Sequence, residues 1–275
     1  TTLLKIGIDR KIYVHETLQN SYGRLVAISP DSKYGVYGQN LNTLKYHSNG
    51  TIENIHTDNS YIAGIYGDFS SYNGNIITNS GWPGHEIKEF ILLADGRTTI
   101  TENIVDINPT MALLGLQVSP DGRTCIALSN SESKITSLRI NQNGEIILAH
   151  EHTEPKSGPV DLGFTPDSKY LLVSFYDCDG SDGGELRCFS IDNESRLSLV
   201  KSLDLPNCPH GMAVTPDGKY AVVCDFILGK TYFYVVEISE NGGLTYLPDR
   251  DFEYPGLMTA LSFVPDPKSH GFMLY

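Results

Sequence analysis

The chain has little of what marks nucleic-acid-binding or membrane-spanning proteins. Its 275 residues carry 20 basic and 33 acidic side chains, for a formal net charge of −13. This excess of negative charge argues against a general electrostatic attraction to nucleic acid. No window approaches the roughly 18 consecutive apolar residues that a membrane-spanning helix needs. We therefore expect neither a nucleic-acid partner nor a membrane span.

Several motifs of catalytic chemistry are also missing. The sequence has no Gly-rich phosphate loop, no HExxH or GxSxG motif and no Cys/His dyad, so it does not support a covalent serine or cysteine mechanism. The five cysteines show no zinc-like CxxC spacing, and most fall in predicted strands, where a thiol behaves as a small apolar residue. A bridge between Cys178 and Cys188 across one loop stays open as an alternative.

The sequence also lacks a basic, apolar signal segment at its start. We therefore expect a cytoplasmic protein, whereas a signal removed before Thr1 would place it in the periplasm or outside the cell. Hydrophobic residues make up 40% of the chain, which is enough for a large core. We expect one domain spanning residues 1–275, and a monomer.

A short sequence motif, the Pro-Asp phrase, is repeated along the chain. It consists of a short apolar strand, then Pro-Asp, a small residue and a basic residue, and then another strand. The prolines of this phrase stand at 30, 120, 166, 216 and 265, so the spacings are 90, 46, 50 and 49 residues. The first spacing holds two periods, and a degenerate copy lies at 63–79, where an Asn-Gly turn replaces Pro-Asp. A strand-rich period of roughly 40–50 residues is typical of a β-propeller.

A second hairpin follows the first in every period, with an Asn-Gly, Asp-Gly or similar polar turn between its strands. Each period therefore predicts one blade of four antiparallel strands. Residues 3–16 read as an outer hairpin without an inner pair, and residues 261–275 read as an inner pair without an outer hairpin. We therefore predict an all-β, six-bladed propeller whose last blade is closed by strands from both termini, which would leave no open sheet edge.

The segment 209–225, which reads PHGMAVTPDGKYAVVCD, resembles the repeats of the lactonase-like propeller family. That family includes 6-phosphogluconolactonase-type proteins, carboxymuconate cyclases and YVTN-repeat proteins. Its members usually have seven blades, and the Pro-Arg-His stretch of its enzymes corresponds here to Pro209-His210-Gly211. The resemblance covers most of the chain and implies the fold together with a lactonase, cyclase or isomerase activity on a small organic molecule.

Function in a propeller is expected on the face where the loops before the innermost strands gather at the mouth of the central channel. His210 lies on such a loop, and an imidazole there is a candidate general acid or base. Asp225 ends the following strand and is a candidate to orient His210. The alternative readings are a histidine that closes a turn and a carboxylate that caps a loop.

Other side chains are expected on the same face as substrate-binding candidates. Trp82 could stack on a flat apolar ligand or instead fill a gap between blades, and His85 lies in the same loop. Arg24 stands six residues before its proline, as His210 does, and could hold an anionic group. Tyr22, Asn130 and Asp161 complete the set as lining residues.

The loop 177–185 places four carboxylates in nine residues with glycines between them. Alternating acids and glycines suit a hard cation such as calcium, with Asp177, Asp179 and Asp182 as ligands, although no EF-hand pattern is present. A solvated acidic turn is the alternative. We otherwise expect no cofactor.

Two classes of function remain open from the sequence. The first is an enzyme acting on a small organic molecule by non-covalent acid–base or cyclisation chemistry, including pericyclic cyclisation. The second is a non-catalytic propeller that binds a protein or peptide on one face. The irregular loops of the second, fourth and fifth blades favour the enzyme, because residues inserted on one face of a regular array usually serve binding.

Overall fold

The computed structural model describes residues 2–6, 12–17, 26–31, 33–37, 41–47, 51–57, 63–80, 86–107, 113–153, 158–176, 183–227, 229–255, 261, 263–265 and 272–274. Within these residues the chain forms 25 strands and one short 3-10 helix, η1 (Pro248–Arg250). The described part of the chain contains no helix that is long and apolar enough to cross a bilayer. The all-β prediction is confirmed.

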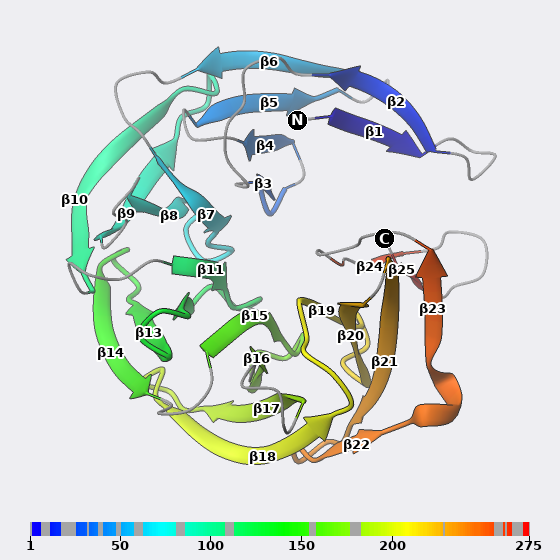
Figure 1. Cartoon of the computed structure of the whole chain (residues 1–275). Helices are drawn as coiled ribbons and strands as arrows, with labels where there is room; N and C mark the ends of the chain where they lie inside the picture. Colours follow the sequence, from blue (N-terminus) through cyan, green and yellow to red (C-terminus); the bar gives the residue numbers. More distant parts are fainter. Residues whose placement is uncertain are drawn as a thin grey trace.

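Five antiparallel sheets follow one another around a common centre (Figure 1). The first blade consists of β3 (Val26–Ile28), β4 (Tyr34–Tyr37), β5 (Asn42–Tyr46) and β6 (Ile52–Thr57). The second consists of β7 (Ala63–Phe69), β8 (Ile76–Ser80), β9 (Glu86–Leu92) and β10 (Thr98–Asp106). The third consists of β11 (Leu113–Val118), β12 (Thr124–Ser129), β13 (Lys134–Ile140) and β14 (Ile146–Thr153).

The last two complete blades continue the same order. The fourth consists of β15 (Gly158–Phe164), β16 (Tyr170–Tyr176), β17 (Gly184–Ile191) and β18 (Leu197–Leu205). The fifth consists of β19 (Gly211–Val214), β20 (Tyr220–Ile227), β21 (Lys230–Ile238), β22 (Leu244–Tyr246) and β23 (Phe252–Pro255), the last two of which pair with different ends of β21. The degenerate repeat at 63–79 is thus confirmed as the inner pair of the second blade.

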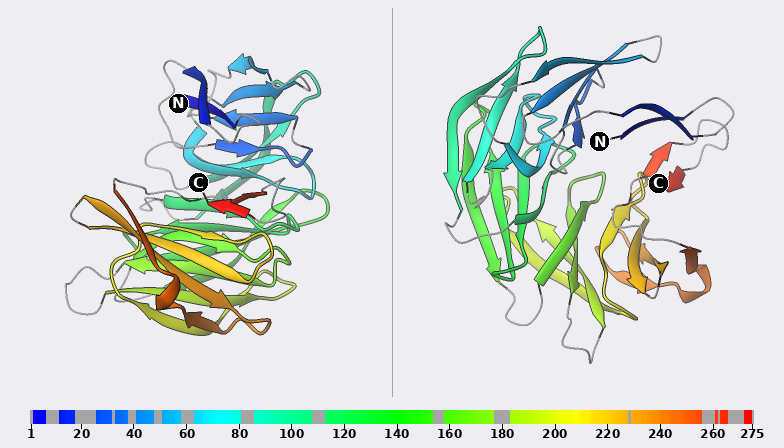
Figure 2. Two further views of the ribbon diagram at one scale, coloured as in Figure 1. Left: turned by 90° about the vertical axis from the view of Figure 1, so that its right-hand side faces the viewer. Right: turned by 45° about the horizontal axis from the view of Figure 1, so that its top comes forward.

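The first strand of each blade lies innermost, so that β3, β7, β11, β15 and β19 surround the centre (Figure 1), and the views of Figure 2 show the blades stacked side by side. Contacts between blades concentrate on these strands, with β11 against β7, β15 against β11 and β19 against β15. Residues far apart in the sequence therefore meet at the centre because each blade contributes one strand to it.

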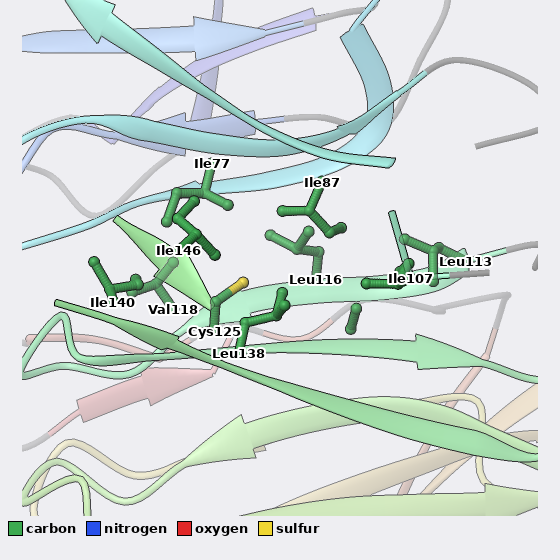
Figure 3. Close-up of a cluster of buried hydrophobic side chains, with 11 residues drawn as sticks. Ile77, Ile87, Ile107, Leu113, Leu116, Val118, Cys125, Leu138, Ile140 and Ile146 are labelled. Carbon is green, nitrogen blue, oxygen red and sulfur yellow. The ribbon is translucent and has the colours of Figure 1, made fainter. Parts of the chain in front are cut away.

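Alternation along the strands explains why the blades pack face to face. Successive side chains of a strand point to opposite faces of its sheet. In β12, Cys125 and Ala127 join the apolar cluster shared with the second blade, whereas Ile126 and Leu128 join the cluster shared with the fourth. Figure 3 shows the first of these clusters, with Ile77 of the second blade among side chains of the third. Both faces of the blade are covered, so every residue of its second strand is buried.

The repeated Pro-Asp phrase forms the turn of the inner hairpin in the first, third, fourth and fifth blades, as predicted. In the third blade Asp121 Oδ1 accepts hydrogen bonds from Ser119 Oγ (2.6 Å) and from the Arg123 backbone N–H (3.1 Å). The phrases at Asp31, Asp167 and Asp217 repeat both bonds. The small residue that follows has a positive φ where it is described, 75° at Gly122 and 59° at Ser168, which explains why glycine recurs there.

The predicted blade count is wrong. The terminal segments do form hairpins, β1 (Thr2–Ile6) with β2 (Ile12–Thr17) and β24 (Phe263–Pro265) with β25 (Phe272–Leu274), but each is a separate two-stranded sheet among the described residues. The two hairpins lie on the side of the ring between the first and fifth blades (Figure 1). A joint blade would need a ladder between β25 and β1, and the three residues of β25 offer few hydrogen bonds for it. The described chain therefore has five blades.

A buried carboxylate holds the end of the second blade together. Glu89 is 1% exposed, and its two oxygens accept four hydrogen bonds from neutral side chains. The donors are Asn73 (3.1 Å), Asn75 (2.7 Å), Thr101 (3.1 Å) and Asn103 (2.6 Å). Asn103 also donates to the carbonyl of Gly144, in the third blade. Glu89 thereby connects β9 to β10 and to the turn between β7 and β8, and Asn103 connects this network to the neighbouring blade.

We predict that Glu89→Gln lowers the free energy of unfolding by about 2–3 kcal/mol, because an amide nitrogen would replace an oxygen that accepts two hydrogen bonds. Urea denaturation followed by circular dichroism measures the change. Glu102→Gln is the matched control, since Glu102 lies in β10 but is exposed. Equal stability of the two variants would show that the network contributes nothing.

Candidate active site

His210 stands directly before the innermost strand of the fifth blade. Its backbone N–H donates to the carbonyl of Cys224 (2.8 Å), which extends the pairing of β19 with β20 by one residue. The side chain is 39% exposed, and its ring packs edge-on against the ring of Tyr176, with centroids 5.6 Å apart. The histidine is thus held in position while part of its ring remains open to solvent.

Asp225 meets His210 as the sequence predicts that it should. His210 Nδ1 lies 3.3 Å from Asp225 Oδ1, and the Asp225 side chain is only 3% exposed. The same nitrogen lies 3.1 Å from the carbonyl oxygen of Cys208. Both neighbours are hydrogen-bond acceptors, so in the neutral ring Nδ1 carries the proton and Nε2 carries the lone pair. Among the described residues Nε2 has no hydrogen-bond partner, which leaves it available to a ligand.

A cavity of about 310 Å³ lies among the innermost strands. Its wall includes Met212, two residues beyond His210, and Leu114. Leu114 precedes Pro120 by six residues and His210 precedes Pro216 by six, so both occupy the same level of the repeat. The His210–Asp225 pair corresponds in the repeat to the level of Leu114, but neither residue is among those that line the cavity. Its full lining consists of Tyr66, Gly67, Asp68, Leu114, Gly115, Leu116, Gln117, Asp161, Leu162, Met212 and Leu261.

Two carboxyl groups in the cavity wall also join neighbouring blades. Asp68 Oδ2 accepts a hydrogen bond from the Val118 N–H (3.0 Å), which runs from β7 to β11. Asp161 Oδ2 accepts one from the Met212 N–H (2.8 Å), which runs from β15 to β19. Burial raises the pKa of Asp68 and that of Asp161 to about 6, against the opposing effect of these hydrogen bonds. Both groups titrate close to neutral pH.

The Cys224 thiol lies close enough to both acidic groups to respond to their charges. Burial raises the pKa of this thiol to about 12, with a smaller contribution from the charges of Asp161 and Asp225. Cys224 is therefore a neutral thiol rather than a nucleophile, in agreement with the sequence.

The remaining predicted residues divide between the described and the undescribed parts of the chain. Asn130 follows β12 and packs against Gly158, where any side chain would collide with it. It is not among the residues that line the cavity. The other candidates lie outside the described residues, namely Tyr22, Arg24, Trp82, His85 and the proposed calcium ligands Asp177, Asp179 and Asp182. Cys188 is a buried free thiol, so the Cys178–Cys188 bridge is not formed.

Two residues of the cavity wall were missed by the sequence reasoning. Asp68 interrupts an otherwise apolar and small-residue strand, and Gln117 stands among apolar residues of β11. A polar residue in an innermost strand is the signal that could have revealed them. Such a strand packs between two neighbouring blades and borders the centre of the ring.

Comparison with known proteins identifies the family. The model of the family described as "Lactonase, 7-bladed beta-propeller" matches residues 84–254, which is more than half of the 275-residue chain. The chain therefore belongs to the lactonase family of β-propellers. The five blades described here are fewer than the seven of the family description. No curated protein matches the chain.

Solved structures share the fold at low sequence identity. A Bacteroides fragilis protein with the provisional name 6-phosphogluconolactonase superimposes with a TM-score of 0.73 at 16% identity, over 96% of this chain and 80% of that one. A Bacteroides uniformis protein with the same provisional name gives 0.70 at 16% identity, over 91% and 77%. The periplasmic gluconolactonase of Pseudomonas aeruginosa gives 0.53 at 14% identity, over 91% and 90%.

The raised pKa values predict a pH-dependent stability. Asp161 rises from 3.8 to about 6 on folding, so between these values the folded state binds more protons than the unfolded state, and stability falls as pH increases. Asp161→Asn removes this titration. We therefore predict that the variant gains about 3 kcal/mol relative to the wild type between pH 3.5 and pH 7, at about 1.4 kcal/mol per pKa unit.

Urea denaturation at several pH values measures this difference, and Asp68→Asn should behave in the same way. Asp249→Asn serves as the control, because Asp249 is exposed and its removal should leave the slope unchanged. A difference that stays constant with pH would show that Asp161 keeps its ordinary pKa in the fold.

Proposed function

We propose that this protein is a lactone hydrolase that opens small organic lactones at the His210–Asp225 pair. The observation that carries the proposal is the 3.3 Å contact between His210 Nδ1 and Asp225 Oδ1, in a histidine two residues before Met212 of the cavity wall. Family membership supports the reaction class, and the named relatives act on 6-phosphogluconolactone and on gluconolactone by their names. The sequence predicts acid–base chemistry at the same two residues.

His210 would act first as a general base. With the Nδ1 proton held by Asp225 and the Cys208 carbonyl, Nε2 can accept a proton from a water molecule that attacks the carbonyl carbon of the lactone. The attack forms a C–O bond and a tetrahedral intermediate, and the imidazole ring of His210 becomes an imidazolium. The buried Asp225 stabilises this positive charge because it lies beside the protonated ring.

His210 would act next as a general acid. When the intermediate collapses, the bond between the carbonyl carbon and the ring oxygen breaks, and the ring oxygen takes the proton from Nε2. The product is an open-chain hydroxy acid, and the imidazole returns to its starting state. No covalent bond to the protein is needed, which fits the raised pKa of the nearby Cys224 thiol.

The reaction has a signature that separates it from the other activities expected from the sequence. Hydrolysis releases one carboxylic acid for each lactone opened, and this acid can be titrated. A cyclisation or an isomerisation would consume substrate without this release of acid. A propeller that only binds a protein or peptide would neither consume the lactone nor release acid.

We predict that His210→Gln lowers kcat for lactone opening by about 10²–10⁴-fold, the usual contribution of a general acid–base. The rate is measured in a pH-stat after subtraction of the uncatalysed opening. His47→Gln is the matched control, because His47 Nε2 also contacts a carboxylate, Glu53, at 3.0 Å but lies in the first blade, away from the cavity wall. If both variants keep the wild-type rate, the proposed site is wrong.

A further inference from the structure

We infer that the lactone accepted by this site is uncharged and polyhydroxylated, and that the central cavity discriminates against a phosphorylated lactone. The inference rests on the proposed hydrolysis at His210 and concerns which lactone reaches it. It is drawn from three side chains, Asp68, Asp161 and Gln117, which line one cavity with hydrogen-bond acceptors.

The three side chains come from three consecutive blades. Asp68 belongs to β7, Gln117 to β11 and Asp161 to β15, and Figure 1 shows β11 between the other two strands around the centre. Each of these blades thus contributes at least one oxygen-bearing side chain to the same space, and β7 adds the hydroxyl of Tyr66 as well. A volume of about 310 Å³ is at the small end of ligand pockets, which typically measure about 300–1,000 Å³.

Gln117 supplies an oxygen that the protein leaves unsatisfied. Its Oε1 is buried and has no hydrogen-bond partner among the described residues. A buried polar atom without a partner is costly, so such atoms usually meet a water molecule or a ligand. The ligand that satisfies this oxygen must bring a hydrogen-bond donor.

The two carboxylates add further acceptors to the cavity. Asp68 accepts the N–H groups of Phe69 and Val118, and Asp161 accepts those of Leu162 and Met212. An ionised carboxylate offers about four lone-pair positions, so each group retains acceptor capacity after these two bonds. The wall is therefore complementary to a ligand rich in donors, and the hydroxyl groups of a sugar lactone are such donors.

Charge sets the discrimination against phosphate. Above pH 6 both carboxylates are largely ionised, and the lining includes no basic residue in the described part of the chain. A phosphate group that entered the cavity would stand near two like charges in surroundings that screen them less than water does. An uncharged hydroxyl in the same place would instead donate to them.

Binding is measured with ligands that cannot be opened. The probes are a six-carbon aldono-δ-lactam, in which a ring N–H replaces the ring oxygen, and its 6-phosphate, titrated calorimetrically into the wild-type protein at pH 7.5. We expect the uncharged lactam to bind at least about tenfold more tightly, a ratio that corresponds to about 1.4 kcal/mol. Equal affinity, or tighter binding of the phosphate, overturns the inference.

Variants assign the preference to the cavity. Asp68→Asn and Asp161→Asn should each reduce the ratio of the two dissociation constants at least about threefold, because each removes one like charge. Asp249→Asn, which removes an exposed charge outside the cavity, should leave the ratio unchanged. Gln117→Leu should weaken binding of the uncharged lactam without changing the ratio. Circular dichroism confirms that each variant is folded.

The outcomes separate this inference from the proposed function. If the 6-phosphorylated lactone is hydrolysed faster and bound more tightly, lactone hydrolysis stands and the inference fails. If neither lactone is hydrolysed but the uncharged lactam binds with the expected preference, the proposed reaction fails and the ligand class stands. A ratio that Asp249→Asn lowers as much as Asp68→Asn and Asp161→Asn do overturns the role given to the cavity carboxylates.

Discussion

The alternation of side chains along each strand is the constraint on which this fold depends. It gives a blade two apolar faces, and each must be covered by another blade. In β16, Leu172 belongs to the cluster shared with the fifth blade, whereas Leu171 and Val173 belong to the cluster shared with the third. Blades that need a neighbour on both faces pack around a common centre. A small space remains between their innermost strands. The central cavity is a consequence of how the blades bury their faces.

The residues that line this space serve the scaffold and the site together. Asp68 and Asp161 each accept a backbone N–H of the next blade, so they hold neighbouring innermost strands in register. The same burial that makes these bonds valuable raises their pKa values to about 6 and leaves acidic groups in the wall of the cavity. Asp161 bonds to β19 at Met212, two residues beyond His210. Asp68 and Asp161 therefore both join neighbouring blades and supply acidic groups to the cavity wall.

Much of the fold could be predicted from the sequence because its signals are local. The Asp-capped turn at Asp121 depends on residues within three positions of it, and Gly122 adopts the positive φ that the turn requires. The contact between His210 and Asp225 was also predictable, since the short hairpin of β19 and β20 brings the two residues opposite each other. The blade count was not, because the terminal hairpins β1–β2 and β24–β25 carry the right patterns and yet remain separate sheets. Whether distant strands pair depends on the length of the ladder they can form.

The sequence by itself determined the all-β class, the positions of the repeated hairpins and the contact of His210 with Asp225 in the fifth blade. Periods of two residues and turns of a few residues are short-range properties, and they are readable wherever they occur. Only the tertiary structure decided that Asp68, Gln117 and Asp161 share a cavity, because they come from three blades and lie more than 40 residues apart. Their burial, their raised pKa values and the unsatisfied oxygen of Gln117 arise from neighbours that no local pattern specifies.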